Sequence, residues 1–236
     1  MQLFYNADIT SETSEVLFNK IESRHIVRVL RKNEGDVLQI TNGKGLLFDV
    51  KITFANDKKC VASIINVQEK PKHWKYYVHI AIAPTKNNDR LEWFLEKATE
   101  LGIDEITPII CQNSERKIVK IERLEKIIVS AVKQSLKYQV PKLNPPIRFM
   151  DFISTPFDGK VYMAHCAEDV EKKSLKKHVR PKEKTIILIG PEGDFSKEEI
   201  QKSMHKKIIS VSLGESRLRT ETAALVAVQN IAFINE

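Results

Sequence analysis

Short apolar runs dominate the first part of the chain. Asp36–Thr41, Leu46–Thr53 and Cys60–Val67 are rich in Val, Ile and Leu, have the length of strands and are separated by turn residues. The NGKG sequence at 42–45 has the composition of a hairpin loop. Ser23–Lys32, ahead of these runs, is expected to be helical or irregular. The pattern therefore predicts a small, mainly β domain at the N-terminal end.

The hydrophobic period changes beyond Pro71-Lys72-His73, which has the character of a linker. From there, strand-like runs alternate with segments of helical spacing, and this alternation predicts a largely parallel sheet covered by helices. The expected strands are Tyr77–Ala83, Glu105–Cys111, Val161–Cys166, Ile186–Gly190 and Ile208–Val211. The domain boundaries that follow are 1–70 and 74–236.

Local signals mark where helices of the second domain begin and end. Asn88 or Asp89 is expected to cap a helix that Gly102 terminates. Ser196 with Glu199 forms a capping-box pattern, and the last helix is expected to start near Thr220 with an acidic first turn. Another helix is expected over 121–135. The lysine-rich tract 170–184 is interpreted as a solvated loop or a short helix.

Two glycine-bearing turns carry the clearest chemical pattern. One follows the run ending at Ile189 and contains Gly190, Pro191 and Glu192; the other, around Gly214, is followed by arginines and an RTET sequence. Neither turn is a phosphate-binding loop, because no G-x-x-x-x-G-K-[ST] is present and no G-x-G-x-x-G follows a strand. Ligands of open α/β sheets bind where strands end. The turns therefore indicate one pocket for a ligand other than a pyrophosphate.

These motifs resemble those of a known family. The pair GPEGDFS and LGESRLRTETA is similar to the motif pair of the small-subunit ribosomal RNA uracil-N3 methyltransferases, a branch of the SPOUT superfamily. The resemblance extends over nearly the whole chain, through HIVRVLRKNEGDVLQITNGKG, LEWFLEKATELGIDEITPI and AVKQSLKYQVPKL. It implies a SPOUT-type α/β trefoil-knot methyltransferase domain preceded by a small β-barrel, PUA-like RNA-binding domain. Knots are rare, so the resemblance alone supports this one.

The resemblance also implies a binding site for S-adenosylmethionine, formed by three turns. Glycines in such turns let the main chain approach an adenosine closely. The implied cofactor-binding residues are His165, Ile189, Gly190, Pro191, Glu192, Gly193, Ser212, Leu213, Gly214 and Leu218. In-line methyl transfer to a uridine N3 requires an oriented and electron-rich nucleophile.

Arg219, Arg217 and Glu192 are the candidate catalytic residues. A guanidinium can hold a substrate phosphate or stabilise negative charge on a uracil oxygen. The alternative for both arginines is an ion pair with a nearby glutamate that holds the turn. Glu192 is interpreted as a positioning residue, since a neighbouring arginine would depress its pKa. The general base stays unassigned.

Cations elsewhere are candidates for RNA contacts, which are often made to phosphate and ribose. The expected RNA-binding residues are His25, Arg28, Arg31, Lys32, Lys86 and Lys137. The family often has arginine at the positions of Lys137 and Gln139, so these departures favour a substrate contact over a catalytic arginine there. Asp194 stands where the family often has a second glycine, which a turn tolerates.

Bulk properties restrict the partners only mildly. The formal charge of +7 favours an anionic partner. The sequence shows no apolar run of membrane-spanning length, no signal peptide and no metal-ligand spacing of its histidines. The three cysteines are far apart, which is typical of a reduced, cytoplasmic protein. The expected partners are small-subunit ribosomal RNA or the assembled 30S subunit and, from the resemblance, a second copy in a homodimer.

Other functions fit parts of the pattern. The nearest is a SPOUT methyltransferase of another RNA, or of a ribose 2′-hydroxyl. A non-catalytic ribosome-assembly protein would use the same fold only to hold RNA, but it would have no need of intact cofactor turns. A dehydrogenase is disfavoured because the dinucleotide fingerprint is missing.

Overall fold

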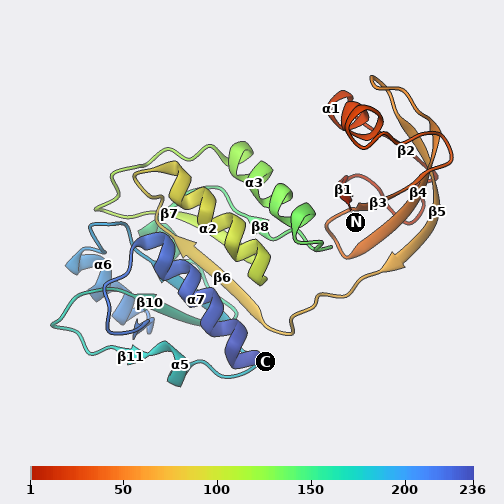
Figure 1. The fold of residues 1–236 in the computed structure, drawn as a ribbon. Helices are drawn as coiled ribbons and strands as arrows, with labels where there is room; N and C mark the ends of the chain where they lie inside the picture. The colour runs from red at the N-terminus through yellow and green to blue at the C-terminus, as the bar shows by residue number, and fades with distance from the viewer. Residues whose placement is uncertain (1) are drawn as a thin grey trace. The chain divides into compact units, whose positions relative to one another are not determined.

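The structure is a computed structural model that describes residues 2–236. The chain forms two compact units. The first contains the chain up to His73 together with Val132–Val140, and the second contains Trp74–Ala131 and Pro141–Glu236. Figure 1 shows the elements of both units.

The N-terminal unit is built on a five-stranded sheet in the order β1-β3-β4-β5-β2. The strands are β1 (Leu3–Tyr5), β2 (Glu15–Leu17), β3 (Val37–Thr41), β4 (Leu46–Phe54) and β5 (Val61–Glu69), with α1 (Lys20–Arg24) and the π-helix η1 (His25–Val29) between β2 and β3. The three predicted strands are confirmed. β1 and β2 were not predicted, because three residues are too few to show an alternating pattern.

A segment distant in sequence completes this unit. The Val140 N–H donates to the Gly43 carbonyl at 2.9 Å, and the Gly45 N–H donates to the Tyr138 carbonyl at the same distance. Gln139 Nε2 donates to the Lys70 carbonyl at 2.6 Å. The hairpin loop 42–45 therefore pairs with 138–140, a segment that sequence patterns assign to the second domain. Such pairing has no local signal.

The C-terminal unit contains an eight-stranded sheet. Its strands are β6 (Tyr77–Ile82), β7 (Glu105–Ile110), β8 (Lys142–Leu143), β9 (Ile147–Arg148), β10 (Lys160–Ala164), β11 (Lys173–Ser174), β12 (Lys184–Ile189) and β13 (Ile209–Ser212). The order is β11-β13-β10-β12-β6-β7-β8, with β9 paired to β7, and every recorded pairing is parallel. The predicted parallel sheet is confirmed. The central strands β6 and β12 are buried almost throughout, as sheets covered on both faces require.

The helices after β6 are α2 (Asn88–Leu101), α3 (Ile121–Gln134), α4 (Phe149–Phe152), α5 (Leu175–His178), α6 (Lys197–His205) and α7 (Thr220–Asn235). The last residues of α3, from Val132, belong to the N-terminal unit. Figure 1 shows α2 and α7 side by side along the sheet. Gly102 ends α2 in a left-handed conformation, and the capping box of Ser196 and Glu199 is present, both as predicted. The cap of α2 was predicted one or two residues too late, since Asn87 accepts the bond from Asp89 N–H.

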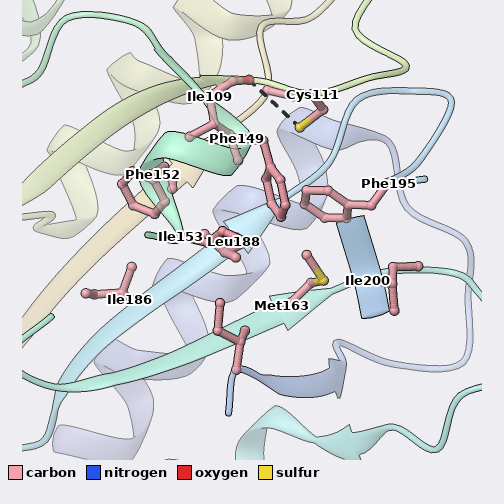
Figure 2. Close-up of a cluster of buried hydrophobic side chains, with 13 residues drawn as sticks. Ile109, Cys111, Phe149, Phe152, Ile153, Met163, Ile186, Leu188, Phe195 and Ile200 are labelled. Atoms are coloured by element: carbon pink, nitrogen blue, oxygen red, sulfur yellow. Dashed lines mark hydrogen bonds between the residues drawn. The ribbon is translucent and has the colours of Figure 1, made fainter. Parts of the chain in front are cut away.

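An apolar core lies on the face of the sheet that is covered by α4 and α6, and Figure 2 shows it. The rings of Phe149 and Phe195 lie with their centroids 5.3 Å apart, and Met163, Leu188 and Ile200 are buried with them. Phe195 belongs to the turn that follows β12. Its burial fixes that turn against the core.

Candidate cofactor and substrate site

Three turns lie together where parallel strands of the C-terminal sheet end. The first turn follows β10, the second follows β12 and the third follows β13. Ala164, the last residue of β10, is in register with Ile189 of β12 on one side and with Val211 of β13 on the other. Because all three strands are parallel, the residues that follow them lie at the same edge. His165, Gly190 and Ser212 are therefore neighbours, and the structure brings together the three segments that the sequence assigned to the cofactor.

Side chains tie the three turns to one another. The hydroxyl of Thr220 donates to the Gly190 carbonyl at 3.1 Å. Asp194 Oδ2 accepts from the Cys166 N–H at 2.7 Å, which joins the second turn to the first. Asp194 has φ of 60°, a left-handed conformation that glycine favours and aspartate tolerates. Its carboxylate thus gives this position a linking role that glycine would lack.

Several buried polar atoms at this edge have no partner. Both ring nitrogens of His165 and Oε2 of Glu221 are buried without a hydrogen bond within the part of the chain that the structure describes. Buried polar groups in folded proteins are nearly always hydrogen-bonded, so these atoms are available to a polar ligand or to water. Burial lowers the pKa of His165. The neutral ring then offers one donor and one acceptor.

Space for a ligand is available at Gly214 and absent at the other two glycines. A Cβ on Gly214 would meet no atom of residues 2–236 within 4 Å, and the residue has φ of 153°. A Cβ on Gly190 would lie 3.0 Å from the ring of Phe195, and one on Gly193 would lie 3.3 Å from Asn113 Cβ. Gly190 and Gly193 therefore allow close packing of protein on protein, whereas Gly214 faces open space beside the half-buried Leu213.

Arg217 and Arg219 are both exposed, and within residues 2–236 neither forms an ion pair. The alternative role as structural ion-pair partners therefore has no support in the contacts. Arg219 stands at the N-cap position of α7 but makes no side-chain capping bond. Both guanidinium groups are free to meet an anionic ligand at the mouth of the third turn.

Arg90 on α2 contacts the neighbouring glutamates, which is the ion-pair role considered above for Arg217 and Arg219. Its guanidinium lies 4.0 Å from Glu192 Oε1 and 3.9 Å from Glu221 Oε1. Arg90 thereby joins the turn that follows β12 to the N-terminal end of α7. Sequence reasoning did not single out Arg90, although its place immediately before LEWFLEKATELG was a usable signal.

Glu192 is engaged on the protein side of the site. Its Oε1 accepts from the Lys86 N–H at 3.0 Å, in addition to the contact with Arg90. The Lys86 side chain reaches Glu115 at 2.9 Å, and Arg116 donates to the Lys86 carbonyl. These contacts hold the loop between β6 and α2 against the turn that contains Gly190 and Glu192.

The predicted RNA-binding residues fall in different units. His25, Arg28, Arg31, Lys32 and Lys137 belong to the N-terminal unit, whereas Lys86 belongs to the C-terminal unit. Arg28 pairs with Asp57 at 2.8 Å, and Lys32 lies 4.0 Å from Asp36. Arg31 is exposed, with a left-handed backbone conformation.

Metal-binding residues and membrane-spanning helices would indicate other classes of site. Within residues 2–236 no three His, Cys, Asp or Glu side chains are grouped as they would be around a metal ion. Over the same range, no helix combines the length and apolar character that crossing a bilayer requires. Cys60, Cys111 and Cys166 are free thiols.

Comparison with known proteins identifies the family to which the chain is similar. A family model described as an RNA methyltransferase domain matches residues 72–232, and one described as an RNA methyltransferase PUA domain matches residues 19–65. Ribosomal RNA small subunit methyltransferase E of Mesomycoplasma hyopneumoniae (strain 232) is 29% identical over 214 residues, which are 89% of this chain and 90% of that protein.

Solved structures agree over the whole chain. A crystal structure described as a probable rRNA-methyltransferase from Porphyromonas gingivalis has a TM-score of 0.92 and 41% identity, covering 100% of this chain and 98% of that one. Ribosomal RNA small subunit methyltransferase E from Neisseria gonorrhoeae, solved bound to S-adenosyl methionine, has a TM-score of 0.85 and 26% identity, with 100% and 98% covered. The predicted fold class and family are confirmed: the chain belongs to the RNA methyltransferase domain family, with a SPOUT-type α/β-knot domain preceded by a PUA-like domain.

Proposed function

We propose that the protein is an S-adenosylmethionine-dependent methyltransferase that methylates N3 of a specific uridine in small-subunit (16S) ribosomal RNA. The observation that carries the proposal is the meeting of three turns at the carboxyl ends of parallel strands, where two buried nitrogens of His165 form no hydrogen bond within residues 2–236. The names of the similar proteins support an rRNA substrate. The resemblance of the two motifs to the uracil-N3 methyltransferases supports the position on the base.

The residues at this edge fit S-adenosylmethionine. Gly214 leaves open space for an adenosine, the ring nitrogens of His165 offer polar contacts, and Leu213 and Leu218 present partly exposed apolar surface. The remaining proposed contacts are the backbone groups of Ile189, Gly190, Pro191, Gly193 and Ser212. Bound there, the cofactor supplies an activated methyl group for transfer to a nucleophile.

Arg219 and Arg217 would act on the substrate side. Their guanidinium groups are exposed and unpaired within residues 2–236, so they are available to stabilise negative charge on the uracil oxygens as N3 loses its proton. Glu192 would act as a positioning residue, because its carboxylate already accepts from Lys86 N–H and contacts Arg90. Arg90 would keep the second turn and α7 in register for this step.

The N-terminal unit would bind RNA through its basic residues, and the C-terminal unit, residues 74–131 and 141–236, would form the catalytic domain. A second copy of the chain is the proposed partner of α7. This helix has no charged side chain between Glu221 and its C-terminal residue Asn235, and Phe233 is 63% exposed on it. Such an apolar surface is typical of a subunit contact. The substrate would be ribosomal RNA or the assembled 30S subunit in the cytoplasm.

Mass mapping of methylated nucleotides tests the proposal. Small-subunit rRNA from cells with and without this gene should differ by one methyl group, located on N3 of one uridine. Purified protein should bind S-adenosylmethionine in calorimetry, with NAD and ATP silent. A methyl group on a ribose 2′-hydroxyl would replace the proposed position, and NAD binding would remove the methyltransferase assignment. Phe233→Glu should dissociate the dimer in light scattering.

A further inference from the structure

One short segment carries more positive charge than the whole C-terminal unit. Residues 74–131 and 141–236 together contain 25 Lys and Arg and 22 Asp and Glu, an excess of three, whereas residues 171–184 alone contain seven and two, an excess of five. The other residues of the unit therefore have a net charge of −2. The proposed cofactor and uridine contacts do not use this segment.

The segment is held in place by two apolar anchors. Leu175 is 0% exposed and Val179 is 6% exposed, and α5 packs against α7. Both ends are tied to the unit: Lys172 Nζ donates to the Ala167 carbonyl at 2.7 Å, and the Lys182 N–H donates to Asn235 Oδ1 at 2.6 Å. The segment therefore presents its charges from a fixed backbone.

Within residues 2–236, four cations in and beside α5 form no ion pair. They are Lys173, Lys176, Lys177 and Arg180, and all four are exposed. Lysines at the margins of the sheet behave differently, since Lys160 pairs with Glu183 at 2.8 Å. An ordinary solvated surface interleaves both signs of charge. Four unpaired cations on one fixed segment instead form a positive surface.

The positive surface begins beside the proposed site. Lys173 is in register with Val211 and Ser174 with Ser212, so β11 lies against the end of β13, from which the third cofactor turn begins. Figure 1 shows β11 and α5 following one another along this side of the unit. A lysine on an edge strand also discourages sheet-to-sheet pairing. That role explains Lys173, but it does not explain the cations of α5 and Arg180.

We propose that Lys173, Lys176, Lys177 and Arg180 bind the phosphate backbone of the RNA substrate and hold it on the catalytic unit. The proposal rests on the proposed rRNA methylation. Phosphate contacts fix the position and orientation of a nucleic acid without reading its sequence. A strand held next to the third turn would keep its target nucleotide near Arg217 and Arg219. The N-terminal unit would then supply only part of the affinity for RNA.

Two matched double variants test this surface. Lys176→Gln with Lys177→Gln removes adjacent cations of the segment. Lys206→Gln with Lys207→Gln removes another exposed pair, between α6 and β13, that forms no ion pair within residues 2–236. The probe is small-subunit rRNA transcribed in vitro, with affinity measured by filter binding across a range of KCl. The first variant should weaken binding and reduce the slope of log K against log[salt] by about 1.4–1.8, the value for two lost phosphate contacts. The control should keep the wild-type slope.

Calorimetry with S-adenosylmethionine separates the possible failures. Both variants should bind the cofactor as the wild type does. An unchanged salt slope in the Lys176/Lys177 variant, or an equal loss in the control, overturns the phosphate surface. Weakened binding to assembled subunits with unchanged binding to the transcript also overturns it, and assigns the segment to a ribosomal protein. Failure of the wild type to bind cofactor or rRNA would instead overturn the proposed function.

Discussion

The buried polar groups at the two ends of the parallel strands in the C-terminal sheet differ in their hydrogen bonding. At the edge where β6 and β7 begin, Glu105 accepts from Asn144 Nδ2 at 2.6 Å, from Lys142 at 3.1 Å and from Tyr77. His79 is hydrogen-bonded to Thr107 at 2.7 Å. At the opposite edge, His165 and Glu221 keep buried atoms unbonded among the described residues. A network in which every polar group is hydrogen-bonded, here called the closed network, stabilises the fold. Polar atoms without a partner at the strand ends can instead bind a ligand.

The pKa values of the closed network follow from its contacts. Burial would raise the pKa of Glu105, but the hydrogen bonds from Asn144 and Tyr77 outweigh it and lower the pKa to about 2. Burial lowers the pKa of His79 to about 4. Both groups therefore hold one protonation state at neutral pH. The comparison predicts that changes at this edge affect stability and changes at the other affect turnover.

The largest expected effect is at Arg219. Arg219→Ala should lower kcat by about 10²–10³-fold, because it removes a donor aimed at charge that develops on the uracil. The melting temperature should stay near wild type, since within residues 2–236 the guanidinium makes no ion pair and no cap bond. Single-turnover methylation at saturating cofactor, run beside a thermal melt, measures both. Arg148→Ala, at another exposed arginine, is the control. A destabilised but fully active Arg219 variant would defeat the catalytic assignment.

The second largest expected effect is that of a substitution at Gly214. Gly214→Val should weaken cofactor binding by about tenfold to a hundredfold, or about 1.4–2.7 kcal/mol, because the branched side chain occupies the open space proposed for the ligand. Backbone strain is controlled by Gly35→Val, since Gly35 also has positive φ and open space around its Cβ but lies in the N-terminal unit. Calorimetry with circular dichroism follows binding and folding separately. Equal cofactor affinity in both variants would show that the pocket lies elsewhere.

The closed network should respond in stability alone. Glu105→Ala should lower the free energy of unfolding by about 2–3 kcal/mol, because Asn144, Tyr77 and Lys142 lose a shared acceptor. Glu125→Ala, at an exposed glutamate of α3, should change it by less than about 0.5 kcal/mol. Urea unfolding measures the difference. A large loss of kcat in the Glu105 variant, measured on folded protein, would contradict the proposed separation between the two edges.

The smallest effect is a pH dependence. Between the folded pKa of about 4 and the ordinary value of 6.5, the folded state binds fewer protons at His79 than the unfolded state does. Stability therefore falls as the pH is lowered through this window, by about 2 kcal/mol from pH 7 to pH 5. The slope should shrink in His79→Gln. Burial also lowers the pKa of His165, so His165→Gln is the comparison. An unaltered slope in His79→Gln would assign the dependence to other groups.

Local patterns were sufficient for much of the architecture. The Gly102 terminator and the capping box of Ser196 depend on neighbouring residues, and both are present. The glycine turns around Gly190 and Gly214 were likewise recognisable, because glycine at a strand end restricts few conformations but marks a sharp change of direction. Each strand and helix also has its own local pattern, and the alternation of these patterns along the chain was sufficient to predict the parallel sheet that is present.

The sequence by itself thus determined the class of sheet, the family resemblance and the segments of the candidate site. Only the tertiary structure decided which side chains have partners. It brought Arg90 to Glu192 and Glu221, left Arg217 and Arg219 without ion pairs within residues 2–236, and packed 138–140 against the 42–45 loop. Each outcome depends on contacts between segments tens of residues apart. Hydrogen bonds and ion pairs act over a few ångströms, so only the folded chain determines which of these groups pair.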